Sequence, residues 1–256
     1  MHRLAASGPP LGGLDAIVQM LSTDDTDPPS GRPWVSTDMV MSLDGAYSSD
    51  GTSGGLSSDA DHALFIAHRS TADAILVGAS TVREEGYRRP TVSEEAAERR
   101  RVRSQSALPL LVVVSSSLDL GTNTPLLHGD PPAPIIAHPA RSDTSNAPEG
   151  LELIQAGEAT VDLARLLSEL AGRGVRRVAC EGGPGLLGQL AKDDLIDEFL
   201  VTISPQLVGG TSVGLLGGVG LPGGVGTGNL PFELHAVLRD GNHLMCSYRR
   251  VRDAAR

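Results

Sequence analysis

The most constraining feature of this sequence is residues 175–192, Val-Arg-Arg-Val-Ala-Cys-Glu-Gly-Gly-Pro-Gly-Leu-Leu-Gly-Gln-Leu-Ala-Lys. The segment predicts a short strand over 175–180, an acidic residue, a glycine turn, and a helix beginning at Pro184, whose missing N–H would be unpaired there anyway. The first N–H groups of such a helix attract anions, and paired glycines leave them uncovered. We therefore predict a phosphate cradle beside Glu181, although the pattern alone also fits an ordinary strand-to-helix turn.

Length and charge limit what such a cradle can serve. The 256 residues are enough for one domain, or two small ones. Hydrophobic residues make up 40% of the chain but aromatic residues only 3%, which predicts an aliphatic core. The formal net charge of −10 argues against a nucleic-acid partner, because phosphate backbones need a basic face. A phosphorylated ligand would have to meet a few local arginines and backbone dipoles.

The cysteines and the N-terminal segment bear on location. Cys180 and Cys246 fall in strand-like runs, so we expect buried thiols in a reducing, cytoplasmic setting. The first thirty residues hold no apolar run of signal-peptide length, and no segment approaches a membrane span. We therefore expect no membrane partner. The histidines lack metal-ligand spacing, so we also expect no bound metal.

The order of predicted elements indicates the fold class. We predict an N-terminal extension and linker over 1–33, with a short helix at 14–21, and one domain over 34–253. Strands are predicted at 34–41, 72–78, 110–114, 135–137, 151–155, 175–180 and 198–203, helices from about Asp59 and at 93–105 and 161–171, and a hairpin over 232–239 and 243–251. This alternation predicts an α/β fold with a mixed, mostly parallel sheet, helices on both faces and a C-terminal β-hairpin.

Three segments need separate comment. Ser58 is a plausible N-cap for the helix that follows it. The helix at 93–105 has glutamates early and arginines late, as the macrodipole favours, so we predict a solvated helix, the alternative being arginines near a phosphate. The glycine-rich loop at 209–229 has too few anchoring side chains for its shape to be predicted.

Four segments in order carry a family resemblance: Ser42-Leu43-Asp44-Gly45, Ala72 to Val82, Glu181-Gly182-Gly183-Pro184, and Ile203-Ser204-Pro205 ahead of Gly209-Gly210. Together they resemble the reductase domain of riboflavin biosynthesis, the C-terminal half of bifunctional deaminase-reductases and a branch of the dihydrofolate-reductase-like fold. The resemblance implies reduction of 5-amino-6-(5-phosphoribosylamino)uracil to its ribitylamino product with NADPH. It also implies a phosphorylated small-molecule substrate and a homodimer.

The resemblance also implies roles for individual residues. Substrate contacts fall on Ser53, Arg69 and Glu181, and a guanidinium such as that of Arg69 suits a phosphate. Cofactor contacts are expected from Gly78, Thr81, Arg83, Glu85, Ser116, Gly182, Gly183, Pro184, Gly185, Leu186 and Leu187. For Arg83 we weigh the 2′-phosphate of NADPH against a surface ion pair. A cis peptide bond is implied between the paired glycines, as in dihydrofolate reductases.

The ring-opened form of the expected substrate carries an imine at the ribose C1. Its reduction needs a proton as well as a hydride, and Asp44 or Glu181 could relay that proton through water. Asp44 has an alternative role as a turn residue ahead of Gly45. Glu181, at a strand end beside a bare turn, is expected to bind substrate more than to transfer a proton.

The chain departs from the family pattern at several places. Many members have Asp-Asp-Pro a few residues past the threonine, whereas this chain has Glu84-Glu85-Gly86-Tyr87, with Glu85 aligned to a cofactor-contacting aspartate. Gly55 stands where relatives often carry tryptophan. The zinc motif of the deaminase half is absent from the sequence. Two other functions stay open: a pterin or dihydrofolate reductase, against which the few aromatic residues weigh, and a nucleotide-binding module without turnover.

Overall fold

The computed structural model describes residues 17, 21, 27–49, 51–121, 124–129, 132–209, 214–219, 221 and 229–252. Most of the helix predicted at 14–21 lies outside these residues, as does part of the glycine-rich loop.

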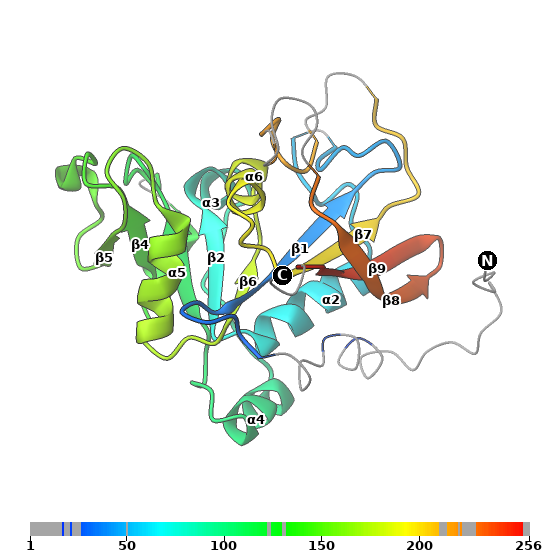
Figure 1. The fold of residues 1–256 in the computed structure, drawn as a ribbon, viewed down its shortest axis with the longest axis horizontal. Coiled ribbons are helices and arrows are strands. Elements are labelled where there is room, and N and C mark those ends of the chain that lie inside the picture. Colours follow the sequence, from blue (N-terminus) through cyan, green and yellow to red (C-terminus); the bar gives the residue numbers. More distant parts are fainter. Residues whose placement is uncertain are drawn as a thin grey trace.

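Within the described residues, nine strands form one sheet in the order β5-β4-β3-β2-β6-β1-β7-β9-β8 (Figure 1). The strands are β1 (Trp34–Met41), β2 (Ala74–Gly78), β3 (Leu110–Val114), β4 (Ile135–His138), β5 (Glu152–Gln155), β6 (Arg177–Cys180), β7 (Glu198–Ile203), β8 (Phe232–Asp240) and β9 (His243–Arg250). Strands β1 to β7 pair in parallel, whereas the hairpin β8–β9 is antiparallel and joins the sheet through β7. The predicted mixed, mostly parallel sheet with a C-terminal hairpin is confirmed.

Between residues 34 and 252, the helices of the described residues follow the predicted order with one addition. They are α2 (Asp59–Thr71), α3 (Ala79–Glu84), α4 (Glu94–Val102), α5 (Leu163–Gly172) and α6 (Pro184–Lys192), with 3₁₀ turns at Pro125–His128 and Thr144–Asn146. The Ser58 side chain caps α2 by accepting a hydrogen bond from the N–H of Asp61, as predicted. The sequence prediction missed α3 because six residues are too few to show a helical period.

Both faces of the parallel sheet are covered. Along β2, Ala74 and Leu76 pack into the core that α5 and α6 complete, whereas Ile75 and Val77 pack on the opposite face with α3. A strand buried on both faces is the usual consequence of parallel crossovers. Helix α2 lies across the other half of the sheet, where its Leu64 contacts the apolar cluster of β7 and β9. Figure 1 shows α5 and α6 on one side and α2 crossing below β1 and β7.

The strand order places a crevice at one edge of the sheet. Strand β6 lies between β1 and β2, although it follows them by about a hundred residues in the chain. The carboxyl ends of β1, β2 and β6 therefore lie together. Open α/β sheets bind ligands at such switch points, so this edge is where the site is expected.

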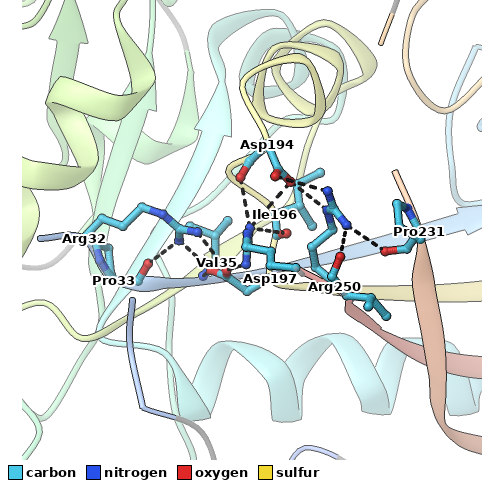
Figure 2. Close-up of polar contacts among 10 residues, drawn as sticks. Arg32, Pro33, Val35, Asp194, Ile196, Asp197, Pro231 and Arg250 are labelled. Atoms are coloured by element: carbon cyan, nitrogen blue, oxygen red, sulfur yellow. Dashed lines mark hydrogen bonds and ion pairs between the residues drawn. The ribbon is translucent and has the colours of Figure 1, made fainter. Parts of the chain in front are cut away.

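A buried ion-pair network closes the opposite edge (Figure 2). The Asp197 carboxylate is fully buried and accepts hydrogen bonds from Arg32 at 2.6 and 2.8 Å, from the N–H of Val35 at 2.8 Å and from Arg252 at 2.5 Å. Asp194 beside it pairs with Arg250 at 2.7 Å. The network joins the segment before β1 to the start of β7 and to the end of β9.

The prediction of a wholly solvated helix over 93–105 is wrong at Arg100. Its side chain is fully buried and donates hydrogen bonds to the carbonyls of Ser70 at 3.1 Å, Ala72 at 2.5 Å and Ser106 at 2.8 Å. The carbonyls of Ser70 and Ala72 belong to the C-terminal end of α2, so the role of Arg100 is set by another helix and the charge pattern of α4 cannot reveal it.

Candidate active site

The larger of two adjoining cavities, with a volume of about 700 Å³, opens at the carboxyl edge of the sheet. Strand β1, helix α2, the segment around α3 and the start of α6 contribute its walls. Of the residues predicted for the site, it is lined by Ser53, Arg69, Thr81, Glu85, Glu181, Gly183, Pro184 and Gly185. Residues spread over more than a hundred positions of the chain thus meet in one space.

A second cavity of about 330 Å³ adjoins the first. The predicted residues that line it are Gly78, Arg83, Ser116, Gly185 and Leu186. Ser80 and Gly185 line both cavities, so the two spaces meet where α3 and α6 begin. Together they form an elongated site that passes the N-terminus of α6.

The glycine turn between the two cavities is bare. The peptide bond between Gly182 and Gly183 is cis, as predicted, and Gly182 has φ +73°, a conformation that favours glycine. A Cβ added at Gly183 would lie 2.7 Å from the Thr81 hydroxyl oxygen, closer than real Cβ contacts come. Because Gly183 is also the N-cap of α6 and has no side chain to cap it, the first N–H groups of the helix remain available to a ligand.

A buried ion pair forms one wall of the larger cavity. The Arg69 guanidinium donates through Nε to Glu181 Oε1 at 2.7 Å and through Nη2 to Oε2 at 2.8 Å. Nη2 also donates to the Tyr87 hydroxyl at 2.8 Å, and that hydroxyl donates to Glu181. The guanidinium lies 4.0 Å from the centre of the Phe65 ring. Arg69 and Glu181, both predicted for the substrate, therefore act as one fixed unit.

Electrostatics reinforce this unit. Burial opposes the charge of Arg69, but its hydrogen bonds and charge pairing with Glu181 outweigh burial and raise its pKa above the usual value. Burial, followed by the charge of Glu181, raises the pKa of Tyr87 well above its usual range, so the phenol stays protonated and can donate.

Asp44, predicted as a possible proton relay, lines neither cavity. Its carboxylate accepts hydrogen bonds from the Ser42 hydroxyl at 2.5 Å and from the N–H groups of Val208 at 3.1 Å and Gly209 at 2.6 Å. These hydrogen bonds lower the pKa of Asp44 to about 2, and the bond from Ser42 has the largest effect. Asp44 therefore connects the turn before Gly45 to the distant segment at Val208 and Gly209.

Two of the predicted cofactor residues are also placed away from the cavity walls. Leu187 is fully buried in the core under α6. Gly182 turns its carbonyl to the N–H of Gly78 at 2.8 Å, which ties the glycine turn to the start of α3. Both support the turn from behind.

Sequence reasoning missed several residues that line the larger cavity, among them Asp38, Asp61, Phe65, Tyr87 and Arg88. For Asp38 a signal exists, because Ser36 and Asp38 put two polar side chains on the same face of a mostly apolar strand. Tyr87 and Arg88 follow the short helix α3, and no local pattern marks them.

The described residues hold no group of three or more histidine, cysteine, aspartate or glutamate side chains that could bind a metal ion. In the same part of the chain, none of the helices is both long and apolar enough to span a bilayer. Cys180 and Cys246 are free and buried, as predicted.

Comparison with known proteins gives a consistent result. Residues 33–246 match the family described as the RibD C-terminal domain. The chain is 30% identical over 183 residues to a protein of Archaeoglobus fulgidus named 2,5-diamino-6-ribosylamino-4(3H)-pyrimidinone 5′-phosphate reductase, a match that covers 70% of this chain and 83% of the relative. A protein of the same name from Methanothermobacter thermautotrophicus is 31% identical over 183 residues, covering 70% and 81%.

Solved structures agree on the fold. A pyrimidine reductase-like protein from Corynebacterium diphtheriae superimposes with a TM-score of 0.76 at 24% identity, covering 86% of this chain and 93% of the other. At that identity the similarity supports the fold alone.

Proposed function

Because the chain belongs to the RibD C-terminal domain family, an oxidoreductase family of the riboflavin pathway, we propose that it reduces a phosphoribosylamino-pyrimidine to the ribitylamino product with NADPH. In this reaction the ribose ring opens to an imine at C1, and hydride addition to that carbon yields the ribityl chain. The two adjoining cavities that meet at a bare glycine turn are the observation that carries the proposal.

The residues of the elongated site fit a nicotinamide dinucleotide. The Thr81 hydroxyl and the N–H of Gly185 lie beside the bare turn, where a diphosphate would meet helix N–H groups. Ser116 lines the smaller cavity, which suits the remaining nucleoside. The reduced nicotinamide supplies the hydride, and the protein orients donor and acceptor carbons and excludes water.

We propose NADPH rather than NADH on the position of Arg83. This exposed arginine lines the smaller cavity and donates to the carbonyl of Asp119 at 2.7 Å. A guanidinium has five donors, so one such bond leaves others for the 2′-phosphate that distinguishes NADPH.

On the substrate side, we infer a division of work between two arginines of the larger cavity. Arg69 has its charge neutralised by Glu181, so the pair offers a fixed polar edge to the ring or sugar of the substrate. Arg88 is exposed and lines the same cavity, and it is the better placed to meet the phosphate.

The named relatives bear on which pyrimidine is used. They are named for a 2,5-diamino-pyrimidinone, whereas the family resemblance of the sequence implies the uracil, which carries a carbonyl in place of the 2-amino group. In the test, the protein and NADPH are mixed with one acceptor at a time: the diamino-pyrimidinone phosphate, the uracil phosphate or dihydrofolate. Oxidation of NADPH is followed by its absorbance. Oxidation with either pyrimidine supports the proposal. Oxidation with dihydrofolate alone, or cofactor binding without any turnover, would replace it with a pterin reductase or a binding module.

A homodimer and a cytoplasmic location are part of the same proposal. The edge strand β8, with Leu234 half exposed at 51%, is a suitable joint. Sedimentation of the purified protein tests the first point.

A further inference from the structure

Asp38 is a buried carboxyl group for which neither the family resemblance nor the proposed function has a role. It lies in the middle of β1, is 9% exposed and lines the larger cavity. Its Oδ2 has no hydrogen-bond partner among the described residues. A buried polar atom is rarely left unpaired without a functional reason, and the side chain to which this oxygen belongs lines the cavity.

His68 on α2 shows which protonation state Asp38 holds. Its Nε2 lies 2.6 Å from the Ser36 hydroxyl, which in turn donates to the carbonyl of Val178 at 3.4 Å. The ring must then donate through Nε2 and keep a lone pair on Nδ1, a tautomer we assign from these bonds. Nδ1 lies 3.7 Å from Asp38 Oδ2 and has no hydrogen-bond partner. A bare nitrogen opposite a carboxyl oxygen favours a proton on the oxygen.

The surrounding charges act in the same direction. Burial, and then the charge of Arg69, lower the pKa of His68 to about 3, so the ring is neutral. Burial, followed by the charges of Asp61 and Glu181, raises the pKa of Asp38 well above its usual value, against a smaller opposing effect of Arg69. Asp38 is therefore held as the neutral acid.

Strand β7 places no charged residue directly opposite Asp38. On β7 its partner is Leu200, and Glu198 further along accepts a hydrogen bond from Ser247 at 2.6 Å.

The other carboxyl groups that line the cavity are hydrogen-bonded or, like Glu84, exposed. Both oxygens of Glu181 accept from Arg69, and Asp61 accepts from the Ser57 hydroxyl at 2.5 Å. Glu85 is exposed and accepts from Ser53. Of the described carboxyl groups, Asp38 alone combines a buried, unpaired oxygen with access to the cavity.

We propose that Asp38 is the general acid of the reduction and passes its proton to the substrate nitrogen while hydride adds to the imine carbon. The new C–H bond takes the electron pair of the hydride, and the π electrons of the C=N bond move to nitrogen. The nitrogen then forms its N–H bond with the Asp38 proton, so that the imine is reduced to the amine and the nicotinamide is oxidised. Asp38 is left as a carboxylate, and water in the cavity returns its proton. This step rests on the proposed function.

The kinetic test compares Asp38→Asn with the wild-type enzyme on whichever pyrimidine it reduces. Asparagine keeps the shape but has no acidic proton, so kcat should fall by about 10² to 10⁴-fold, the usual contribution of general acid catalysis, while KM for NADPH stays unchanged. Wild-type kcat should decline as pH rises and Asp38 ionises, and the residual activity of the variant should lack this decline. Asp59→Asn, an exposed change at the start of α2, is the matched control and should leave both parameters unchanged.

An infrared measurement tests the inference without substrate or cofactor. The wild-type protein at neutral pH should show the carbonyl stretch of a protonated carboxyl group, and Asp38→Asn should lose it. If the band is absent from the wild type, or if the folded variant keeps kcat within twofold, the inference is overturned. If Asp38→Asn does not fold, Asp38→Glu is used instead. It keeps an acidic proton, so it should retain the carbonyl band and the decline of kcat as pH rises, and loss of both overturns the inference. If the band is present but no pyrimidine is reduced, the proposed function fails and the protonated state of Asp38 stands, without its assigned step.

Discussion

Two buried aspartates at opposite edges of the sheet contrast sharply. Asp197 is fully buried, and its oxygens accept from two arginines and a backbone N–H. Asp38 is almost as buried, but its Oδ2 has no hydrogen-bond partner. The residue lines a cavity of about 700 Å³. An unpaired buried polar group is costly, so a carboxyl group that keeps one beside a cavity is a candidate for a functional role. The fully hydrogen-bonded carboxylate of Asp197 therefore indicates a structural role, and the incompletely hydrogen-bonded carboxyl group of Asp38 indicates a functional one.

The largest effect is expected from replacing Asp197, at the amino-terminal edge of the parallel strands. Asp197→Ala leaves Arg32 and Arg252 without their shared carboxylate, and losing one partner of a buried ion pair costs about 3–5 kcal/mol. Urea denaturation should show this loss in the free energy of unfolding, while the folded variant keeps its kcat. Asp193→Ala, an exposed neighbour, should be neutral. A loss of kcat in the folded Asp197 variant would break the contrast.

Glu181→Gln tests an ion pair that is as well bonded as that of Asp197 but lies in the cavity wall. The amide keeps the shape and loses the charge that balances Arg69, and a hydrogen bond to a charged group contributes about 1.5–3 kcal/mol. We expect kcat/KM to fall by about 10- to 100-fold in steady-state kinetics. Tyr87→Phe, which removes one hydroxyl from the unit, should have a smaller effect. A loss of stability with unchanged kcat/KM would group Glu181 with Asp197.

Gly183→Ala tests whether the bare turn belongs to the functional edge. The added Cβ would lie 2.7 Å from the Thr81 hydroxyl oxygen and would cover helix N–H groups, so KM for NADPH should rise by about tenfold. Gly172→Ala is the matched control, because nothing lies within 4 Å of the added carbon. Unchanged cofactor binding in the Gly183 variant would move the dinucleotide away from the turn.

Arg88→Ala sharpens the assignment of charges on the functional edge. Without the exposed guanidinium, KM for the phosphorylated substrate should rise by up to about tenfold, with KM for NADPH unchanged. The wild-type substrate KM should also rise with salt, more than that of the variant. Arg103→Ala, exposed and outside the cavity, should match the wild type. An equal rise in both KM values would remove Arg88 from the phosphate site.

The smallest effect concerns Asp44, a carboxylate saturated like Asp197 but fully exposed. Its pKa is lowered in the folded protein, so its stabilisation is present above the usual value of 3.8 and is lost as pH falls toward about 2. Asp44→Asn should therefore reduce the decline of Tm over this pH range, and leave kcat at neutral pH unchanged if Asp44 only holds the turn. A large loss of kcat would restore Asp44 as the proton relay.

Much of the fold was predictable because the signals are local. The buried run of β2 and the Ser58 cap before α2 each depend on neighbours a few residues away. The same holds for the glycine turn before Pro184, where backbone conformation and helix start are set within the segment. The position of Arg100 could not be predicted, since it satisfies carbonyls belonging to a different helix.

The sequence by itself determined the alternating elements, the bare turn and the acidic residue beside it. Only the tertiary structure decided that Glu181 pairs with Arg69, 112 residues earlier, and that Asp38 faces His68. Both depend on β6 lying between β1 and β2 and on α2 crossing beneath them. Local patterns encode which side of a strand is buried, but strand order follows from how all the apolar faces are covered at once.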